Sequence, residues 1–155
     1  MPQGEISLVE REIRIEAPPE TVFGFFTEPE KMVSWLGRRA TLDPRPGGVF
    51  SFSIDHYRVE GEYVEVEPYR RIVFTWGYGD LPGERVNPLP AGASKVEVEL
   101  VPDGDATVVR LAHRVPAGLV DLHAAGWDNY LPRLAVAAEG GAPESDRFFE
   151  RFRGL

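Results

Sequence analysis

Residues 15–37 read IEAPPETVFGFFTEPEKMVSWLG, a pattern typical of a strand end followed by two short helices and a tryptophan. Pro18 or Pro19 suits the start of the first helix, because proline fixes a helical φ at a position that needs no N–H donor. Residues 123–140 read HAAGWDNYLPRLAVAAEG and predict one long helix with an apolar stripe. Only strand-like runs lie between these segments. The sequence therefore predicts a container shape: a sheet with small helices early and one long helix late.

The composition is that of one soluble globular domain. The chain has 155 residues, of which 43% are hydrophobic and 27% charged. A chain of this size buries roughly 70% of the surface that its unfolded form exposes, so a substantial core is available. The formal net charge of −8 and the pI near 4.9 argue against binding to nucleic acid and to anionic membranes.

Three classes of feature are missing from the sequence. The chain has no cysteine, which excludes disulfides, thiolate zinc sites and cysteine nucleophiles. The N-terminal residues lack the basic and apolar regions of a signal peptide. No apolar run approaches the ~18 residues that span a bilayer. We therefore expect a cytoplasmic protein with no membrane partner.

The middle of the chain predicts strands by alternation of apolar and polar residues. Tyr63 and Val64 are adjacent apolar residues, and this break in alternation predicts a bulge or a change of face on a bent strand. The predicted strands are residues 6–16, 49–55, 58–67 and 71–76, and the two runs on either side of the turn at 103–105. Their inward positions are predicted to include Val9, Ile13, Ile15, Phe50, Phe52, Ile54, Ile72, Phe74, Trp76, Val96, Val98, Leu100, Val109, Leu111 and His113.

Residues 77–94 form the main irregular stretch, with four glycines and three prolines. Loops of this length often act as lids or binding loops. A hairpin connection without a role is the alternative, and the sequence leaves both open.

The long helix is expected to begin near Ala117 and to end at Gly140-Gly141. Pro132 lies inside it and removes one helix hydrogen bond, so a kink is expected there. Its apolar stripe comprises Val120, Ala124, Trp127, Leu131, Leu134 and Ala138. Residues 1–142 are therefore expected to form the domain and residues 143–155 a short tail.

The spacing of Phe148, Phe152 and Leu155 in this tail predicts a short amphipathic helix. Its aromatic residues either dock on the protein's own surface or contact a second copy or another protein.

Four stretches resemble a known family. Residues 15–37, PGGVFSFSI at 46–54, EGEYVEVEPYRRIVFTW at 60–76 and GWDNYLPRLAVAAEG at 126–140 resemble, in order, motifs of the START-like superfamily, also called SRPBCC or birch-pollen-allergen-like. Within it they most resemble the family named for the activator of the heat-shock-protein-90 ATPase. The resemblance implies an α+β helix-grip fold, in which a curved antiparallel sheet wraps around the long C-terminal helix and two short helices follow the first strand. It also implies a cavity for hydrophobic ligands between sheet and helix.

The expected cavity face is rich in aromatic rings, which bury large areas and shape apolar pockets. Each ring either fills the core or contacts a ligand. The candidate ligand-binding residues are Trp35, Phe50, Phe52, Tyr63, Phe74, Trp76, His113, Trp127 and Tyr130.

The three histidines match no metal motif. His113 faces inward by alternation, where it either binds a ligand oxygen, acts as an acid or base, or is a satisfied core residue. His123 lies on the side of Trp127, and His56 is expected at the surface. The glutamates of the predicted strands, Glu60, Glu62, Glu65, Glu67, Glu97 and Glu99, mostly alternate opposite the apolar positions and predict a solvated outer face. No metal site, cofactor or catalytic motif is predicted.

Three functions are compatible with these features. The first is binding of a small hydrophobic molecule in an internal cavity. The second, implied by the resemblance, is a protein-interaction role in stress response, as an activator of a chaperone ATPase. The third is a cyclase- or aromatase-like enzyme acting on a hydrophobic ring substrate, with His113 as its acid–base group. The lack of a catalytic motif favours a non-enzymatic role.

Overall fold

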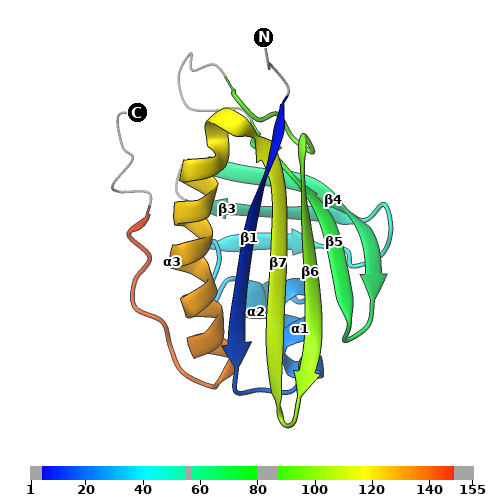
Figure 1. The fold of residues 1–155 in the computed structure, drawn as a ribbon, viewed down its shortest axis with the longest axis vertical. Helices are drawn as coiled ribbons and strands as arrows, with labels where there is room; N and C mark the ends of the chain where they lie inside the picture. The colour runs from blue at the N-terminus through cyan, green and yellow to red at the C-terminus, as the bar shows by residue number, and fades with distance from the viewer. Residues whose placement is uncertain (1–4, 55–56, 80–86, 149–155) are drawn as a thin grey trace.

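The computed structural model describes residues 5–54, 57–79 and 87–148, and within them one seven-stranded antiparallel sheet curves around a long C-terminal helix (Figure 1). The strand order is β1-β7-β6-β5-β4-β3-β2. This is the predicted α+β helix-grip fold. The elements are β1 Ile6–Ile15, α1 Pro19–Thr27, α2 Pro29–Met32, β2 Arg39–Leu42, β3 Val49–Ile54, β4 Tyr57–Glu67, β5 Arg71–Trp76, β6 Ser94–Asp103, β7 Ala106–Pro116 and α3 Val120–Ala138.

The strands form where the sequence alternates, and the apolar side of each strand faces the core. In β3, Phe50, Phe52 and Ile54 are buried while the serines between them are half-buried. The inward positions of β6 and β7 lie opposite one another, and Val96 pairs with His113. The period of two therefore predicted the buried face correctly.

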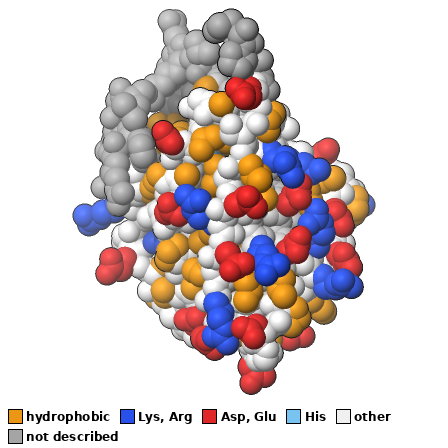
Figure 2. Space-filling model, viewed as in Figure 1, with side chains coloured by type: hydrophobic (Ala, Val, Ile, Leu, Met, Phe, Trp, Pro, Cys, Tyr) orange, Lys and Arg blue, Asp and Glu red, His pale blue; other side chains and the backbone are white. Residues whose placement is uncertain are grey.

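The outer face of the sheet carries charges of both signs, which Figure 2 shows interspersed over β1, β7 and β6. Arg71 reaches Glu65, Glu97 and Glu99 across neighbouring strands. Arg114 also contacts Glu97. The glutamates of these strands thus belong to the solvated face, as predicted.

The sheet has a register shift and also one short strand that the sequence did not predict. The register between β4 and β5 shifts between Tyr63 and Glu65, which is the predicted bulge. β2 was not predicted from the sequence. Its four residues are too few to show a pattern, and it is defined by pairing with β3, where Ala40 lies opposite Phe52.

The two short helices begin with Pro19 and Pro29. The last carbonyls of a helix lack partners within it. In α1 the Tyr63 hydroxyl donates to the Phe26 carbonyl at 2.8 Å, and the Trp35 indole donates to the Phe25 carbonyl at 2.9 Å. These two side chains therefore fix the end of α1 against the sheet.

A 3₁₀ turn, Ala117–Leu119, leads from β7 into α3. The helix continues through Pro132, which is exposed, and ends before Gly140 at φ +93°. Trp127, Leu131, Leu134 and Ala138 of the predicted stripe are buried against the sheet. The core lies between this stripe and the concave face of the sheet.

Candidate functional site

A narrow cavity of about 30 Å³ lies between the sheet and the middle of α3. Its wall is formed by β3, β4, β5, the turn that follows α2, α3 and the tail. The lining side chains are Leu36, Phe52, Ile54, Val59, Trp76, Tyr78, Leu122, His123, Gly126, Trp127, Tyr130 and Phe148. The wall is apolar and aromatic except for a few ring nitrogens and hydroxyls.

Tyr78 and His123 form a hydrogen-bonded pair at this wall. His123 Nδ1 lies 2.8 Å from the Leu119 carbonyl, so that nitrogen carries the proton and donates it. Nε2 is then an acceptor, and it receives the Tyr78 hydroxyl at 3.0 Å. Both ring nitrogens of His123 and the hydroxyl proton of Tyr78 are thus engaged in hydrogen bonds within the protein.

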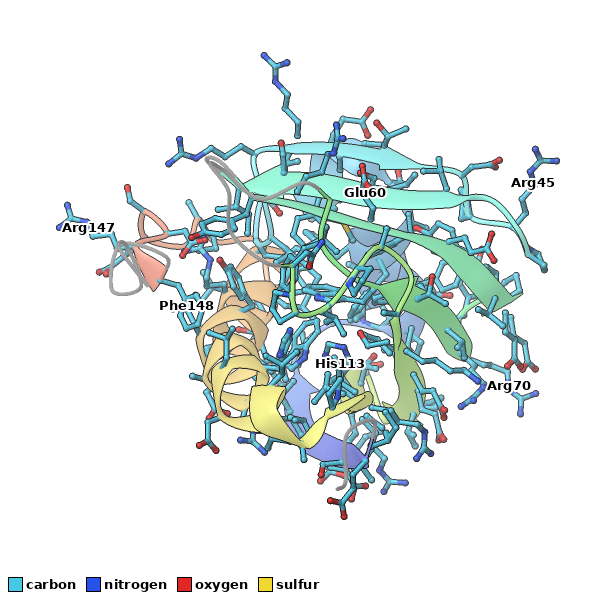
Figure 3. The ribbon with its side chains drawn as sticks, turned by 90° about the horizontal axis from the view of Figure 1, so that it is seen from above. Arg45, Glu60, Arg70, His113, Arg147 and Phe148 are labelled. Carbon is cyan, nitrogen blue, oxygen red and sulfur yellow. The ribbon has the colours of Figure 1, made fainter. Side chains whose placement is uncertain are left out.

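His113 lies in the interior between α3 and the sheet (Figure 3), where it contacts the lining residues Trp76 and Trp127. Its Nδ1 accepts the Trp127 indole N–H at 3.1 Å, so Nε2 carries the proton and donates to Ser94 Oγ at 2.8 Å. Ser94 in turn donates to the Trp76 carbonyl at 2.6 Å. Both imidazole nitrogens are thus occupied, and His113 holds β6, β7 and α3 together.

Both histidines are held in their neutral form. Burial lowers the pKa of His113 well below its ordinary value, and the neighbouring His123 lowers it further. Burial also lowers the pKa of His123, although the hydrogen bond to the Leu119 carbonyl opposes this. Burial raises the pKa of Tyr78 to about 12, so its hydroxyl stays protonated.

One polar group of the wall differs from the others. Trp76 is 7% exposed, and its indole N–H has no hydrogen-bond acceptor within residues 5–54, 57–79 and 87–148. This N–H lies near the Tyr78 hydroxyl and lowers its pKa, against the effect of burial, yet no hydrogen bond of normal geometry joins them. An unsatisfied buried donor costs about 1–3 kcal/mol.

The tail contributes one side of the wall. Phe148 is 3% exposed and packs against the Tyr130 ring, with centroids 5.8 Å apart. Asp146 accepts the Tyr130 hydroxyl at 2.5 Å and the Phe148 backbone N–H at 3.0 Å. Figure 3 shows Phe148 lying against α3 while Arg147 points away from the molecule. The tail helix expected beyond this point lies outside the described residues, as does His56.

The structure divides the nine predicted binding residues into two groups. Phe52, Trp76, Trp127 and Tyr130 line the cavity. The other five are buried in the core around it: Trp35, Phe50, Tyr63, Phe74 and His113. Of these, Trp35 and Tyr63 hold α1, and Phe50 stacks on Phe74 at 4.0 Å.

Sequence reasoning missed Tyr78 and Phe148 as cavity residues. Tyr78 belongs to the irregular stretch 77–94, whose composition had indicated a loop of interest. Its backbone bridges to Val59 and Pro90, and Gly77 beside it has no room for a side chain because a Cβ would lie 1.8 Å from the Pro90 carbonyl oxygen. Phe148 follows the helix by ten residues, and no local pattern indicates where such a residue docks.

No Asp, Glu, Lys or Arg side chain of the described residues lines the cavity. Among those residues no three His, Asp or Glu side chains lie close enough to hold a metal ion. None of the described helices is long and apolar enough to cross a membrane. The described lining of the cavity is therefore uncharged, and its polar atoms are ring nitrogens and hydroxyls.

The fold and this site define a helix-grip protein with a small aromatic cavity between its sheet and its C-terminal helix. The family described as activator of Hsp90 ATPase homolog 1-like protein matches residues 16–139, most of the chain. The chain belongs to this family.

Solved structures share the fold. The AHSA1-like protein of Rhizobium etli is 33% identical, with 92% of this chain and 88% of that chain covered and a TM-score of 0.66. An Hsp90 activator from Plasmodium falciparum is 25% identical over 82% of this chain and 92% of that chain, at a TM-score of 0.67. DynU16, from the dynemicin biosynthetic locus, is 24% identical at a TM-score of 0.72, over 88% of this chain but 48% of that chain.

A curated relative, an uncharacterised protein of Schizosaccharomyces pombe, is 31% identical over 67 residues. This match spans 43% of the present chain and 19% of the relative. The match therefore covers only a small part of the relative's length.

Proposed function

We propose that this chain binds a small hydrophobic molecule in the cavity between the sheet and α3. The observation that carries the proposal is the aromatic wall, to which a tail residue, Phe148, contributes. An apolar wall with few polar groups is the usual composition of a small-molecule site.

The size of the cavity sets a condition on binding. About 30 Å³ is room for one or two water molecules, whereas ligand pockets usually measure ~300–1,000 Å³. A ligand therefore needs part of the wall to move. Phe148 is our candidate for the residue that moves, because it lies in the tail beyond the last helix. Its segment is attached to α3 through Asp146 and Glu144.

Native mass spectrometry of gently purified protein, compared with the denatured chain, tests the proposal directly. We expect an added mass that disappears on denaturation and that identifies the ligand. A chain that carries no added mass and binds no apolar probe in the next experiment would contradict the proposal.

The Phe148→Ala variant tests the route of entry. Because the variant no longer has to displace the ring, its affinity for the neutral dye Nile red is expected to rise about tenfold. Val136→Ala is the matched control, since Val136 is an exposed residue of α3. Equal dye binding by the three chains would rule out the Phe148 side of the cavity as the entrance.

A second candidate is activation of a chaperone ATPase. The family membership and the likeness to the Plasmodium falciparum Hsp90 activator favour it. The test adds this chain to the Hsp90 of its own cell and measures ATP turnover. An unchanged rate over a range that includes stoichiometric excess would exclude this role.

The enzymatic alternative has less support, because both nitrogens of His113 are engaged in the core. If His113→Ala left turnover of a ring substrate unchanged, that residue would have no catalytic role. The cytoplasmic location and the use of the tail in self-association stay predictions.

A further inference from the structure

The polar groups at the cavity differ in whether their hydrogen bonds are made. Tyr78 donates to His123, and the Trp127 indole donates to His113. The Trp76 indole N–H has no acceptor among the described residues. Trp76 lines the cavity, so a bound molecule that brings an acceptor to this N–H gains a hydrogen bond without taking one from the protein.

The charge of the wall restricts that molecule further. The described lining side chains include no ionised group, and burial keeps the one lining histidine, His123, neutral. A carboxylate or an ammonium group would lose its hydration here without meeting an opposite charge, which disfavours its binding. The acceptor must therefore belong to a neutral group.

Phe148 indicates the shape of the rest of the bound molecule. Its ring lies in edge contact with Tyr130 and packs over Gly126 of α3, where an added Cβ would lie 3.8 Å from the ring. An aromatic ring thus already occupies part of the pocket wall, and another ring of similar size finds the same contacts once Phe148 has left.

We infer that the pocket selects a neutral ring compound with one hydrogen-bond-accepting oxygen, whose ring takes the place of Phe148 while its oxygen accepts the Trp76 indole N–H. This rests on the proposed binding function and names its ligand class. Ketones and other carbonyl compounds attached to a ring have this chemistry.

Three probes of similar size separate the elements of this inference: acetophenone, ethylbenzene and benzoate. Their affinities are measured by calorimetry on the full chain and on the full chain carrying Phe148→Ala. We expect acetophenone to bind about three- to tenfold more tightly than ethylbenzene, which is the effect of one net hydrogen bond, and benzoate to bind more weakly than both. Adding Trp76→Phe should bring the ratio of acetophenone to ethylbenzene close to one.

The indole N–H signals in a ¹H–¹⁵N spectrum report on the same contact without a substitution at Trp76. The chain has three tryptophans, and those of Trp35 and Trp127 already donate to protein acceptors. Acetophenone should shift the Trp76 signal downfield and leave the Trp35 signal in place, whereas ethylbenzene should cause no downfield shift. This measurement tests the hydrogen bond between the Trp76 N–H and the probe oxygen even if the Trp76→Phe variant fails to fold.

The outcomes distinguish the inference from the proposed function. If ethylbenzene and acetophenone bind equally, or if benzoate binds as well as acetophenone, the ligand class is wrong while the binding function stands. An unmoved Trp76 signal in the acetophenone complex also overturns the inference. If no probe binds to either chain, the binding function fails and the inference fails with it.

Discussion

His113 and His123 lie with their ring centroids 5.0 Å apart in the interior of a protein that holds both of them neutral. Each tautomer is fixed by its hydrogen bonds: Nε2–H in His113 and Nδ1–H in His123. The unprotonated nitrogen of each ring accepts a hydrogen bond, from the Trp127 indole in His113 and from the Tyr78 hydroxyl in His123. A proton added to either nitrogen would therefore disrupt that hydrogen bond. The pair is therefore a source of acid sensitivity.

We expect the free energy of unfolding to fall as the pH drops from 6.5 to 5. The folded pKa values lie below the unfolded value near 6.5, so the unfolded chain binds more protons in this range. The stabilisation is complete above pH 6.5 and is lost below it, by up to ~1.4 kcal/mol per pH unit for each histidine. Urea unfolding at pH 7.5, 6.5, 5.5 and 5 measures this slope.

His123→Gln supplies the control, because the glutamine carbonyl still accepts the Tyr78 hydroxyl and does not titrate. Its slope between pH 6.5 and 5 should be smaller than that of the natural chain. A stability that stays constant or increases on acidification would show that the two imidazoles become charged in the folded protein.

At the scale of the element, α3 combines a buried stripe with two residues that disfavour helix. Pro132 removes the N–H that the Asp128 carbonyl would accept, and Gly126 costs backbone entropy. The helix nevertheless continues through both, because its buried side packs on the sheet with Trp127, Leu131 and Leu134. Tertiary packing here outweighs local propensity.

Pro132→Ala is expected to stabilise the protein by about 1–3 kcal/mol, because alanine restores the hydrogen bond and the exposed proline ring contributes little burial. The midpoint of urea unfolding measures the change. Val136→Ala, at an exposed position one turn later, should change the free energy of unfolding by less than about 0.5 kcal/mol. A destabilised Pro132→Ala would indicate that the proline shapes α3 for its packing.

At the scale of the whole molecule, the sheet curves around α3, and the described part of the tail runs beside α3 on the side away from the sheet (Figure 1). The described part of the tail returns along α3, where Arg133 donates to the Glu144 carbonyl and Tyr130 to Asp146. This arrangement places Phe148 beside Trp127 and Tyr130 in the cavity wall. The tail is thus an integral part of the candidate site.

A chain that ends at Ala142 should remain folded but lose about 3–5 kcal/mol of unfolding free energy, since it loses a buried phenylalanine and the bonds to Asp146. Circular dichroism and urea unfolding measure fold and stability. Size-exclusion chromatography tests the alternative role of the tail: the same apparent mass with and without the tail is expected, and conversion of an oligomer to a monomer would show that the tail joins chains.

The sequence by itself determined the strands other than β2, the short helices and the long helix, because local periodicity records which side of each strand and helix is buried, and the resemblance to the START-like superfamily implied the helix-grip fold that they form. The sequence predicted the bulge at Tyr63, the inward His113 and the start of the short helices at proline. Four of the nine predicted ring residues line the cavity. The remaining prediction, that these residues bind a ligand, stays a prediction.

Only the tertiary structure decided which polar atoms find partners. The sequence does not distinguish the hydrogen bonding of its three tryptophans. The indole N–H groups of Trp35 and Trp127 reach acceptors on other elements, whereas that of Trp76 forms no hydrogen bond among the described residues. The position of Phe148 and the β2–β3 pairing likewise depend on contacts between segments far apart in the chain. Hydrogen bonds and ring contacts act over a few ångströms in space. A local pattern therefore predicts which face of a strand or helix a residue lies on, but not which residue of another element it contacts.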